Sequence, residues 1–152
     1  MKEARAVAEK KESFRLNLDE RIGHVLRRAY QRHVAIFQQS MIDFKLTAAQ
    51  FIVLATLLEA GERSQSDLVR DTAIDQATIR GIIDRLKARG LVSTMIDASD
   101  ARKVTVRLTR EGEVVTTSAS KNVDGISEAT FNGLSQAERV ALLYLLRRIA
   151  DM

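Results

Sequence analysis

The stretch "DQATIRG", residues 75–81, brings together side chains that can contact the edges of nucleic-acid bases. Gln76 can pair with adenine and Arg80 with guanine, while the methyl groups of Ala77 and Thr78 can contact a thymine methyl. The apolar residues that follow recur at helical spacing and predict a buried stripe on one side. They are Ile79, Ile82, Ile83 and Leu86. The segment therefore predicts a surface helix whose exposed start, Gly81 included, is left for a groove.

Further polar residues around this helix are suited to phosphate contacts. Arg85, Lys87 and Arg89 lie later in the same helix and are better placed for phosphates, which position a protein without specifying sequence. Ser64, Gln65 and Ser66 open the preceding predicted helix, where side chains and unpaired N–H groups can bind a phosphate. Taken singly, each of these residues fits an ordinary solvated helix face equally well. Their order along the chain is the more specific signal.

The polar stretch "DASDARK", residues 97–103, lies between two strand-like runs at 91–96 and 104–108. Most polar turns of this kind only connect strands. This one follows the base-contacting helix by one strand and has Arg102 and Lys103 near its tip. Its position predicts the wing of a winged helix, with Asp100, Arg102 and Lys103 as candidate DNA-binding residues.

Capping signals outline the helices that position these residues. We expect one long helix at roughly 19–43 capped by Asp19, and a second with a capping box of Thr47 and Gln50 and a stop at Gly61. Ser64 and Asp75 cap the next two helices, which a brief turn joins, and Gly90 ends the second. Two short helices joined by a tight turn and followed by a hairpin form a winged helix-turn-helix.

The C-terminal part of the chain predicts two more helices. Thr109 begins the first, a single long helix with poor intrinsic propensity, and Ser135 with Glu138 forms the capping box of the last. The run "VALLYLLRRIA" is apolar almost all round, which predicts burial on more than one side. In a chain of 152 residues, a partner subunit is the expected second side. The predicted fold class is mainly α with a small β-hairpin wing.

Composition narrows the function classes. The chain has no cysteine, which removes disulfides, thiolate metal sites and cysteine oxidation. The net charge of +4 is compatible with nucleic acid without proving it. No apolar run reaches the roughly 18 residues of a membrane span, and the first residues lack a signal-peptide core. We expect one cytoplasmic domain with no membrane association.

No catalytic constellation is present in the sequence. There is no Gly-rich phosphate loop, no triad-like set and no HExxH pair, so the sequence predicts neither an enzyme, a metal site nor a cofactor. Two alternatives stay open. The first is a winged helix that contacts proteins, although the basic wing and helix favour DNA. The second is a DNA-binding dimer without an effector, which sequence cannot exclude.

Three motifs together resemble the MarR family of bacterial transcription regulators. They are the "L-x-x-x-G-L-V" exit from the groove helix (Leu86 to Val92), the Asp-x-x-Asp-x-Arg wing, and the "L-T-x-x-G" start of the next helix (Leu108 to Gly112). The resemblance covers roughly residues 20–150. It is strongest from Leu46 to Gly112.

The resemblance implies a single-domain homodimer over residues 1–152. Residues 1–45 and 110–152 would supply the dimerisation helices, and residues 46–109 the DNA-binding winged helix-turn-helix. Each winged helix would read one half of a palindromic operator, with Arg102 in the minor groove and Asp100 orienting it. Two positions depart from the family: Ala101 replaces a second wing base, and Gly81 falls where a basic residue is often found midway along the groove helix. Arg80, one place earlier, either compensates or points elsewhere.

The resemblance also implies repression that a small aromatic acid relieves, and the N-terminal segment is similar to members controlling aromatic-compound catabolism. His24, Arg27, Arg28 and Gln31 recur at helical spacing opposite the apolar stripe and are the candidate ligand residues. Arg28 and His24 can bind a carboxylate. A solvated basic face explains the same pattern. His33 falls on the apolar stripe, where we expect a buried structural histidine.

Overall fold

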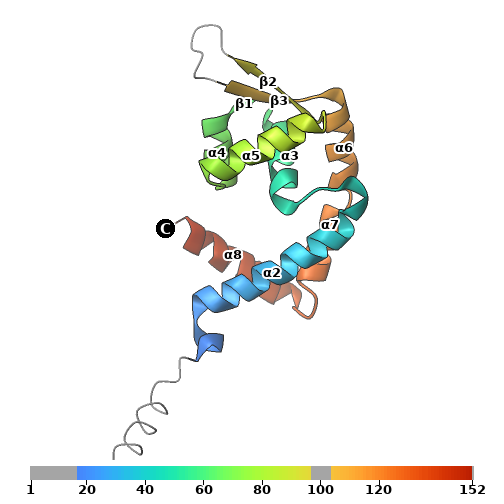
Figure 1. Ribbon diagram of the computed structural model, residues 1–152. Coiled ribbons are helices and arrows are strands. Elements are labelled where there is room, and N and C mark those ends of the chain that lie inside the picture. The colour runs from blue at the N-terminus through green and yellow to red at the C-terminus, as the bar shows by residue number, and fades with distance from the viewer. Residues whose placement is uncertain (1–16, 97–103, 152) are drawn as a thin grey trace, which may run out of the picture. The chain divides into compact units, whose positions relative to one another are not determined.

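The computed structural model describes residues 17–96 and 104–151 (Figure 1). The chain divides into two units, Met1–His33 and Val34–Met152. In the first unit, a 3₁₀ turn, η1 (Leu18–Glu20), precedes the start of helix α2 (Ile22–Ser40), which continues into the second unit. The apolar side chains of Ile22, Val25, Leu26 and Tyr30 are exposed there.

The single helix predicted at 19–43 is wrong at both ends. Asp19 lies inside η1, where the N–H of Arg21 donates to the carbonyl of Leu18, so α2 begins only at Ile22. At the other end the chain tightens into η2 (Ile42–Phe44). Lys45 then adopts a left-handed conformation with φ of 52°, which ends the helical path and forms an elbow before the winged helix.

The helix-turn-helix forms as its capping residues predict. Helix α3 (Ala48–Ala60) begins with the Thr47–Gln50 capping box and ends at Gly61, whose φ is 74°. Helix α4 (Gln65–Thr72) begins with a capping box between Ser64 and Asp67. The left-handed Ala73 then turns the chain into helix α5 (Gln76–Ala88). The side chains at these helix starts satisfy N–H groups that have no partner within the helix.

The sheet contains one strand more than the sequence predicts. Strands β2 (Val92–Ile96) and β3 (Val104–Leu108) form the expected antiparallel hairpin. The two-residue strand β1 (Arg63–Ser64) adds to the other edge of β3, which gives the order β1-β3-β2. β1 therefore connects the end of α3 and the start of α4 to the base of the wing.

One apolar core holds the winged helix together. It combines Leu54, Leu68 and Val106 with the buried face of α5. The four residues of that face, Ile79, Ile82, Ile83 and Leu86, are each at most 2% exposed. Gly112 permits a close backbone approach at the edge of this core, because a Cβ there would lie 1.9 Å from the carbonyl oxygen of Leu91. The "L-T-x-x-G" motif therefore has a packing cause: only glycine lets the start of α6 (Arg110–Ser120) lie against Leu91.

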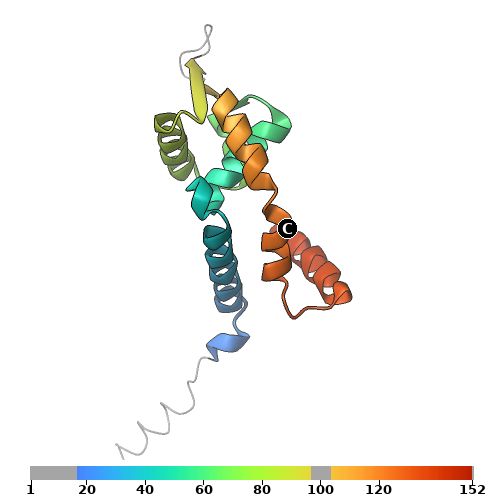
Figure 2. The same cartoon turned by 90° about the vertical axis from the view of Figure 1, so that its right-hand side faces the viewer.

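The long helix predicted from Thr109 is two helices, α6 and α7 (Val123–Thr130), which is a second correction. The N–H groups of Lys121 and Asn122 donate to carbonyls only three residues back, which ends α6. The Asn122 amide then donates to the carbonyl of Ser40 at 2.8 Å, a contact across 82 residues. Figure 2 shows α6 descending from the base of the wing beside α3.

The last helix, α8 (Gln136–Ala150), begins with the predicted Ser135–Glu138 capping box. None of its residues is buried within the chain. Its large apolar residues are all exposed. They are Val140, Leu142, Leu143, Tyr144, Leu145, Leu146 and Ile149. The predicted mainly α fold with a small β-hairpin wing is confirmed.

Candidate nucleic-acid interface

Helix α5 presents its base-contacting residues from a capped start. The Asp75 carboxylate accepts hydrogen bonds from the Thr78 N–H at 2.9 Å and the Thr78 hydroxyl at 2.6 Å. These bonds favour the charged form, so the Thr78 hydroxyl, and then its N–H, lower the pKa of Asp75. With the Thr78 hydroxyl engaged as a donor, its methyl group is the part left for an apolar contact.

The two sides of α5 differ as the sequence predicts. Ile79, Ile82, Ile83 and Leu86 are buried in the core. Gln76, Ala77, Thr78 and Arg80 are exposed. Since Ile79 fixes the rotation of the helix, the four predicted base-contacting residues point away from the core. Figure 1 shows α5 beside α4 in the winged helix.

The basic residues of α5 and its C-cap residue, Arg89, fall into two groups. Lys87 donates from Nζ to the Thr94 hydroxyl of β2 at 2.9 Å. Arg89 donates from Nη1 to the carbonyl of Lys45 and from Nη2 to that of Phe44, each at 2.8 Å. Lys87 and Arg89 thus bind the wing and the elbow. In contrast, Arg80 and Arg85 are exposed, and their side chains form no hydrogen bond or ion pair with residues of the described ranges.

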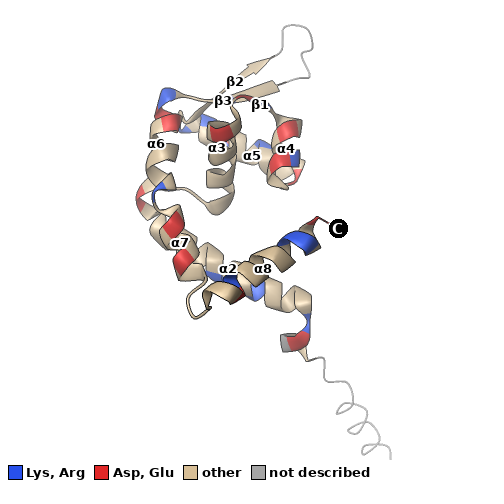
Figure 3. Ribbon diagram, turned by 180° about the vertical axis from the view of Figure 1, so that it is seen from behind, with Lys and Arg blue, Asp and Glu red and all other residues tan. Residues whose placement is uncertain are grey.

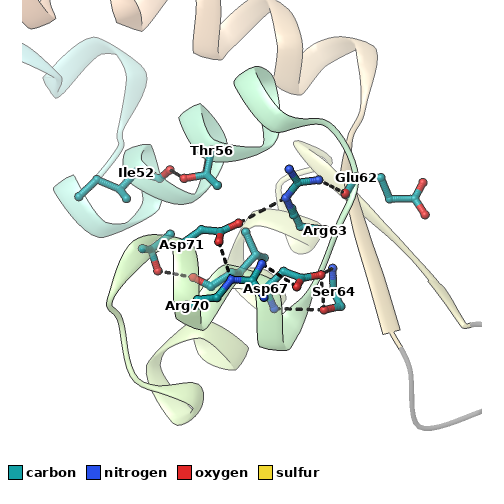
Figure 4. Close-up of polar contacts among 10 residues, drawn as sticks. Ile52, Thr56, Glu62, Arg63, Ser64, Asp67, Arg70 and Asp71 are labelled. Carbon is teal, nitrogen blue, oxygen red and sulfur yellow. Dashed lines mark hydrogen bonds and ion pairs between the residues drawn. The ribbon is translucent and has the colours of Figure 1, made fainter.

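The start of α4 holds the predicted phosphate-binding residues Ser64, Gln65 and Ser66, of which Figure 4 shows Ser64 beside Asp67. The Ser64 hydroxyl donates to the Asp67 carboxylate at 2.7 Å and accepts from the Asp67 N–H at 3.1 Å. Hydrogen bonds from Ser64 are the main cause of the lowered pKa of Asp67. Ser66 is exposed and Gln65 half-buried. The phosphate role of these three residues stays a prediction.

Acidic side chains balance the basic ones on α4. Arg70 forms an ion pair with Asp67 at 2.9 Å and with Asp71 at 3.1 Å, and Arg63 of β1 contacts Asp71 at 3.3 Å (Figure 4). Figure 3 shows this mixture of acidic and basic residues on α4. Arg70 of α4 and Arg63 of β1 are therefore engaged locally, whereas Arg80 and Arg85 of α5 form no ion pair with described residues.

The predicted wing residues Asp100, Arg102 and Lys103 lie outside the described residues. Strands β2 and β3, which lead to them, pair from Val92 with Leu108 out to Ile96 with Val104. The DNA contacts predicted for Asp100, Arg102 and Lys103 therefore stay a prediction.

The candidate ligand residues all lie on α2. His24 is half-buried, while Arg27, Arg28 and Gln31 are exposed. Steps of three and four residues keep the four on one helix face. His33 is half-buried rather than buried, which differs from the expectation for a core histidine. No cluster of metal-ligating side chains occurs among residues 17–96 and 104–151.

The matching relatives are transcriptional regulators. The MarR family model matches residues 44–103. The HTH-type transcriptional repressor NicR of Pseudomonas putida is 49% identical over 135 residues, which cover 89% of this chain and 85% of NicR. The chain belongs to the MarR family. This confirms the resemblance read from the three motifs, and also the expectation of a regulator rather than an enzyme.

Two solved structures have folds similar to that of this chain. BpsR of Bordetella bronchiseptica is a protein whose DNA binding is regulated by 6-hydroxynicotinic acid. It is 54% identical to this chain with a TM-score of 0.82, and the match covers 88% of this chain and 95% of BpsR. PcaV of Streptomyces coelicolor, solved with its natural ligand, is 28% identical with a TM-score of 0.82, covering 90% and 96%. In this MarR-family regulator, no helix of the described ranges is long and apolar enough to cross a membrane.

Sequence reasoning missed the role of Arg89, which it grouped with the phosphate-binding residues of α5. Its acceptors are backbone carbonyls 44 and 45 residues earlier in the chain. Carbonyl groups have no sequence signature, so only the folded structure identifies this contact.

Proposed function

We propose that this MarR-family regulator is a homodimeric repressor that binds a palindromic operator and is released by a small aromatic acid of the hydroxynicotinic acid class. The observation that carries the proposal is the 54% identity to BpsR over 88% of the chain. The DNA binding of BpsR is regulated by 6-hydroxynicotinic acid, and NicR is named a repressor.

Helix α5 supports the DNA-binding half of the proposal. Its exposed start carries Gln76, Thr78 and Arg80, whose side chains match the hydrogen-bonding and methyl groups of the major groove. A dimer presents two such helices to half-sites about one helical turn apart, so a two-fold protein reads a palindrome. Arg102 and Lys103 are proposed to contact DNA from the wing.

Helix α8 supports the dimer. It is a helix of 15 residues with none buried within the chain, although many of its large side chains are apolar. An exposed apolar surface of this kind marks an interaction site. A second copy of the chain is the partner that a two-fold operator requires.

For the effector, we propose that Arg28 binds the carboxylate and that His24 contacts a ring hydroxyl or nitrogen. Arg forms planar paired hydrogen bonds with a carboxylate, which suits an aromatic acid. An acid that binds the DNA-incompetent arrangement of the dimer more tightly shifts the population toward it and lowers operator affinity.

The proposal is tested by fluorescence anisotropy with a labelled duplex from upstream of the protein's own gene. 6-Hydroxynicotinic acid should release the duplex, whereas the neutral amide of the same ring should not, because it lacks the carboxylate. Arg28→Ala should bind DNA as the wild type does but need at least tenfold more acid for release.

Two results would contradict parts of this proposal. Tight operator binding with neither release nor thermal stabilisation by any aromatic acid would identify a DNA-binding dimer without an effector. Absence of DNA binding would favour a winged helix that contacts proteins.

A further inference from the structure

On the outer face of α5, Gly81 has no side chain, and the side chain of Arg85 lies over this position. A Cβ added at Gly81 would be 3.6 Å from Nη2, 3.8 Å from Nη1 and 3.9 Å from Cζ of Arg85. The guanidinium of Arg85 therefore extends back along the helix and covers Gly81, one turn toward the N-terminus. Gly81 is half-buried for this reason, while Ala77, Asp84 and Ala88 on the same face are exposed.

This position follows from helix geometry. Residues four apart lie on the same face, and helical side chains lean toward the N-terminus and cover the turn before their own Cα. The guanidinium of Arg85 is thus displaced by about one turn, roughly 5 Å, toward the start of α5. The early turns of a groove-binding helix are those that reach base edges.

The Arg85 guanidinium is also available for a ligand. It makes no hydrogen bond or ion pair with the described residues, and Arg85 is exposed. The next two basic residues behave differently, since Lys87 binds Thr94 and Arg89 binds the carbonyls of Phe44 and Lys45. Among the described residues, none accepts from the five donor N–H groups of the Arg85 guanidinium, so these groups can bind DNA.

We propose that Arg85 reads a guanine in the major groove through paired hydrogen bonds to O6 and N7, and that Gly81 provides the space for its guanidinium. Arg85 thereby determines sequence specificity and is not one of the phosphate contacts. The inference rests on the proposed operator binding. A bulkier residue at position 81 would lift the guanidinium off the helix and prevent this geometry.

A selection experiment from random duplexes tests the assignment, and it requires no defined operator. Wild-type protein and Arg85→Ala each select duplexes from the same random library. The wild-type consensus should contain one guanine in each half-site that the Arg85→Ala consensus lacks, with the other positions retained. Lys87→Ala is the matched control, since it removes one charge from the same helix and should leave the consensus unchanged.

Affinity measurements then examine the contact itself. Replacing the identified guanine with 7-deazaguanine removes the N7 acceptor and keeps the base pair. This replacement should weaken wild-type binding by roughly 5- to 150-fold, the range for a paired arginine–guanine contact. It should leave the affinity of Arg85→Ala unchanged. Arg85→Lys keeps the charge without the fork and should lose discrimination as Arg85→Ala does.

Variants at position 81 separate the geometry from the charge. Gly81→Ala places its Cβ at ordinary contact distance from the guanidinium and should retain guanine discrimination. Gly81→Leu should lose it although Arg85 is still present. Thermal unfolding monitors the fold of both, and each should be at least as stable as the wild type, because glycine disfavours a helix interior.

Three results would overturn the assignment of Arg85 to a guanine. If Arg85→Ala weakens binding to all duplexes by one factor, lowers the salt slope by about one unit and keeps the consensus, Arg85 is a phosphate contact and the inference is overturned. Loss of guanine preference in Arg80→Ala with retention in Arg85→Ala would assign the contact to Arg80. If the wild-type protein selects no duplex at all, the proposed function fails and the inference fails with it.

Discussion

The winged helix and helix α8 are both rich in apolar residues, but the winged helix buries these residues within the chain and α8 exposes them. In the winged helix, Leu54, Leu68, Ile79 and Leu86 are completely buried within the chain. In α8, no residue is buried, and Leu145 is 52% exposed. At about 25 cal/mol for each Å² of apolar surface removed from water, burial stabilises the winged helix through its own contacts, whereas α8 would gain this stabilisation only in the dimer proposed above.

The largest expected effect is on the stability of the winged helix, which buries its own apolar residues. Gly112→Ala forces a Cβ to within 1.9 Å of the Leu91 carbonyl oxygen, so the start of α6 must move away from the core. We expect a loss of about 4 kcal/mol in the free energy of unfolding, measured by chemical denaturation. Gly81→Ala, which meets only ordinary contacts, is the control and should not destabilise. Equal stability of both variants would show that the close approach at Gly112 costs nothing.

A substitution on α8 tests whether its exposed apolar residues form the proposed dimer interface. Leu145→Glu should weaken dimerisation by about 3 kcal/mol, or roughly 100-fold in the dimer Kd, because it places a charge in the proposed interface. Sedimentation velocity at a series of concentrations measures the shift to monomer. Gln136→Glu adds the same charge at the polar start of α8 and should leave the dimer intact. An unchanged Kd for Leu145→Glu would move the interface away from this face.

The smallest expected effect is the loss of the N-terminal caps of α5 and α8 at acid pH. Thr78 lowers the pKa of Asp75 at the start of α5, and the hydroxyl of Ser135 does the same for Glu138 at the start of α8. A carboxyl whose pKa is lowered in the folded state stabilises it fully above the ordinary carboxyl pKa of about 4, and this stabilisation is lost as the pH falls through the lowered value.

The first turns of both helices should therefore lose protection from amide exchange as the pH falls below about 4. In the Leu145→Glu monomer, we expect α8 to lose more than α5, because four buried side chains still hold α5 in the core. Hydrogen exchange followed by NMR, expressed as protection factors, measures the difference. Equal losses would mean that packing does not support the α5 cap.

Local signals predicted much of the fold from the sequence. The caps at Thr47, Ser64, Asp75, Thr109 and Ser135 all form, because each depends on residues within one turn. The hairpin strands also occur where alternation places them. These features depend only on neighbours in the sequence, so the rest of the chain does not alter them.

The missed features depend on distant contacts. The break between α6 and α7 involves Asn122 and the carbonyl of Ser40, and strand β1 exists only because β3 lies beside it. In the candidate site, the sequence identified the residues of α5 but grouped Arg85 with Lys87 and Arg89. Their separation depends on which partners the fold brings to each side chain.

The two hydrogen bonds from Arg89 to the elbow have a consequence for mutational tolerance. Their acceptors are the backbone carbonyls of Phe44 and Lys45, which every amino acid supplies. Positions 44 and 45 can therefore change without removing an acceptor, whereas a change at position 89 removes the guanidinium that donates both bonds together. For these two hydrogen bonds, the constraint on the sequence falls on position 89 and not on the acceptor positions 44 and 45.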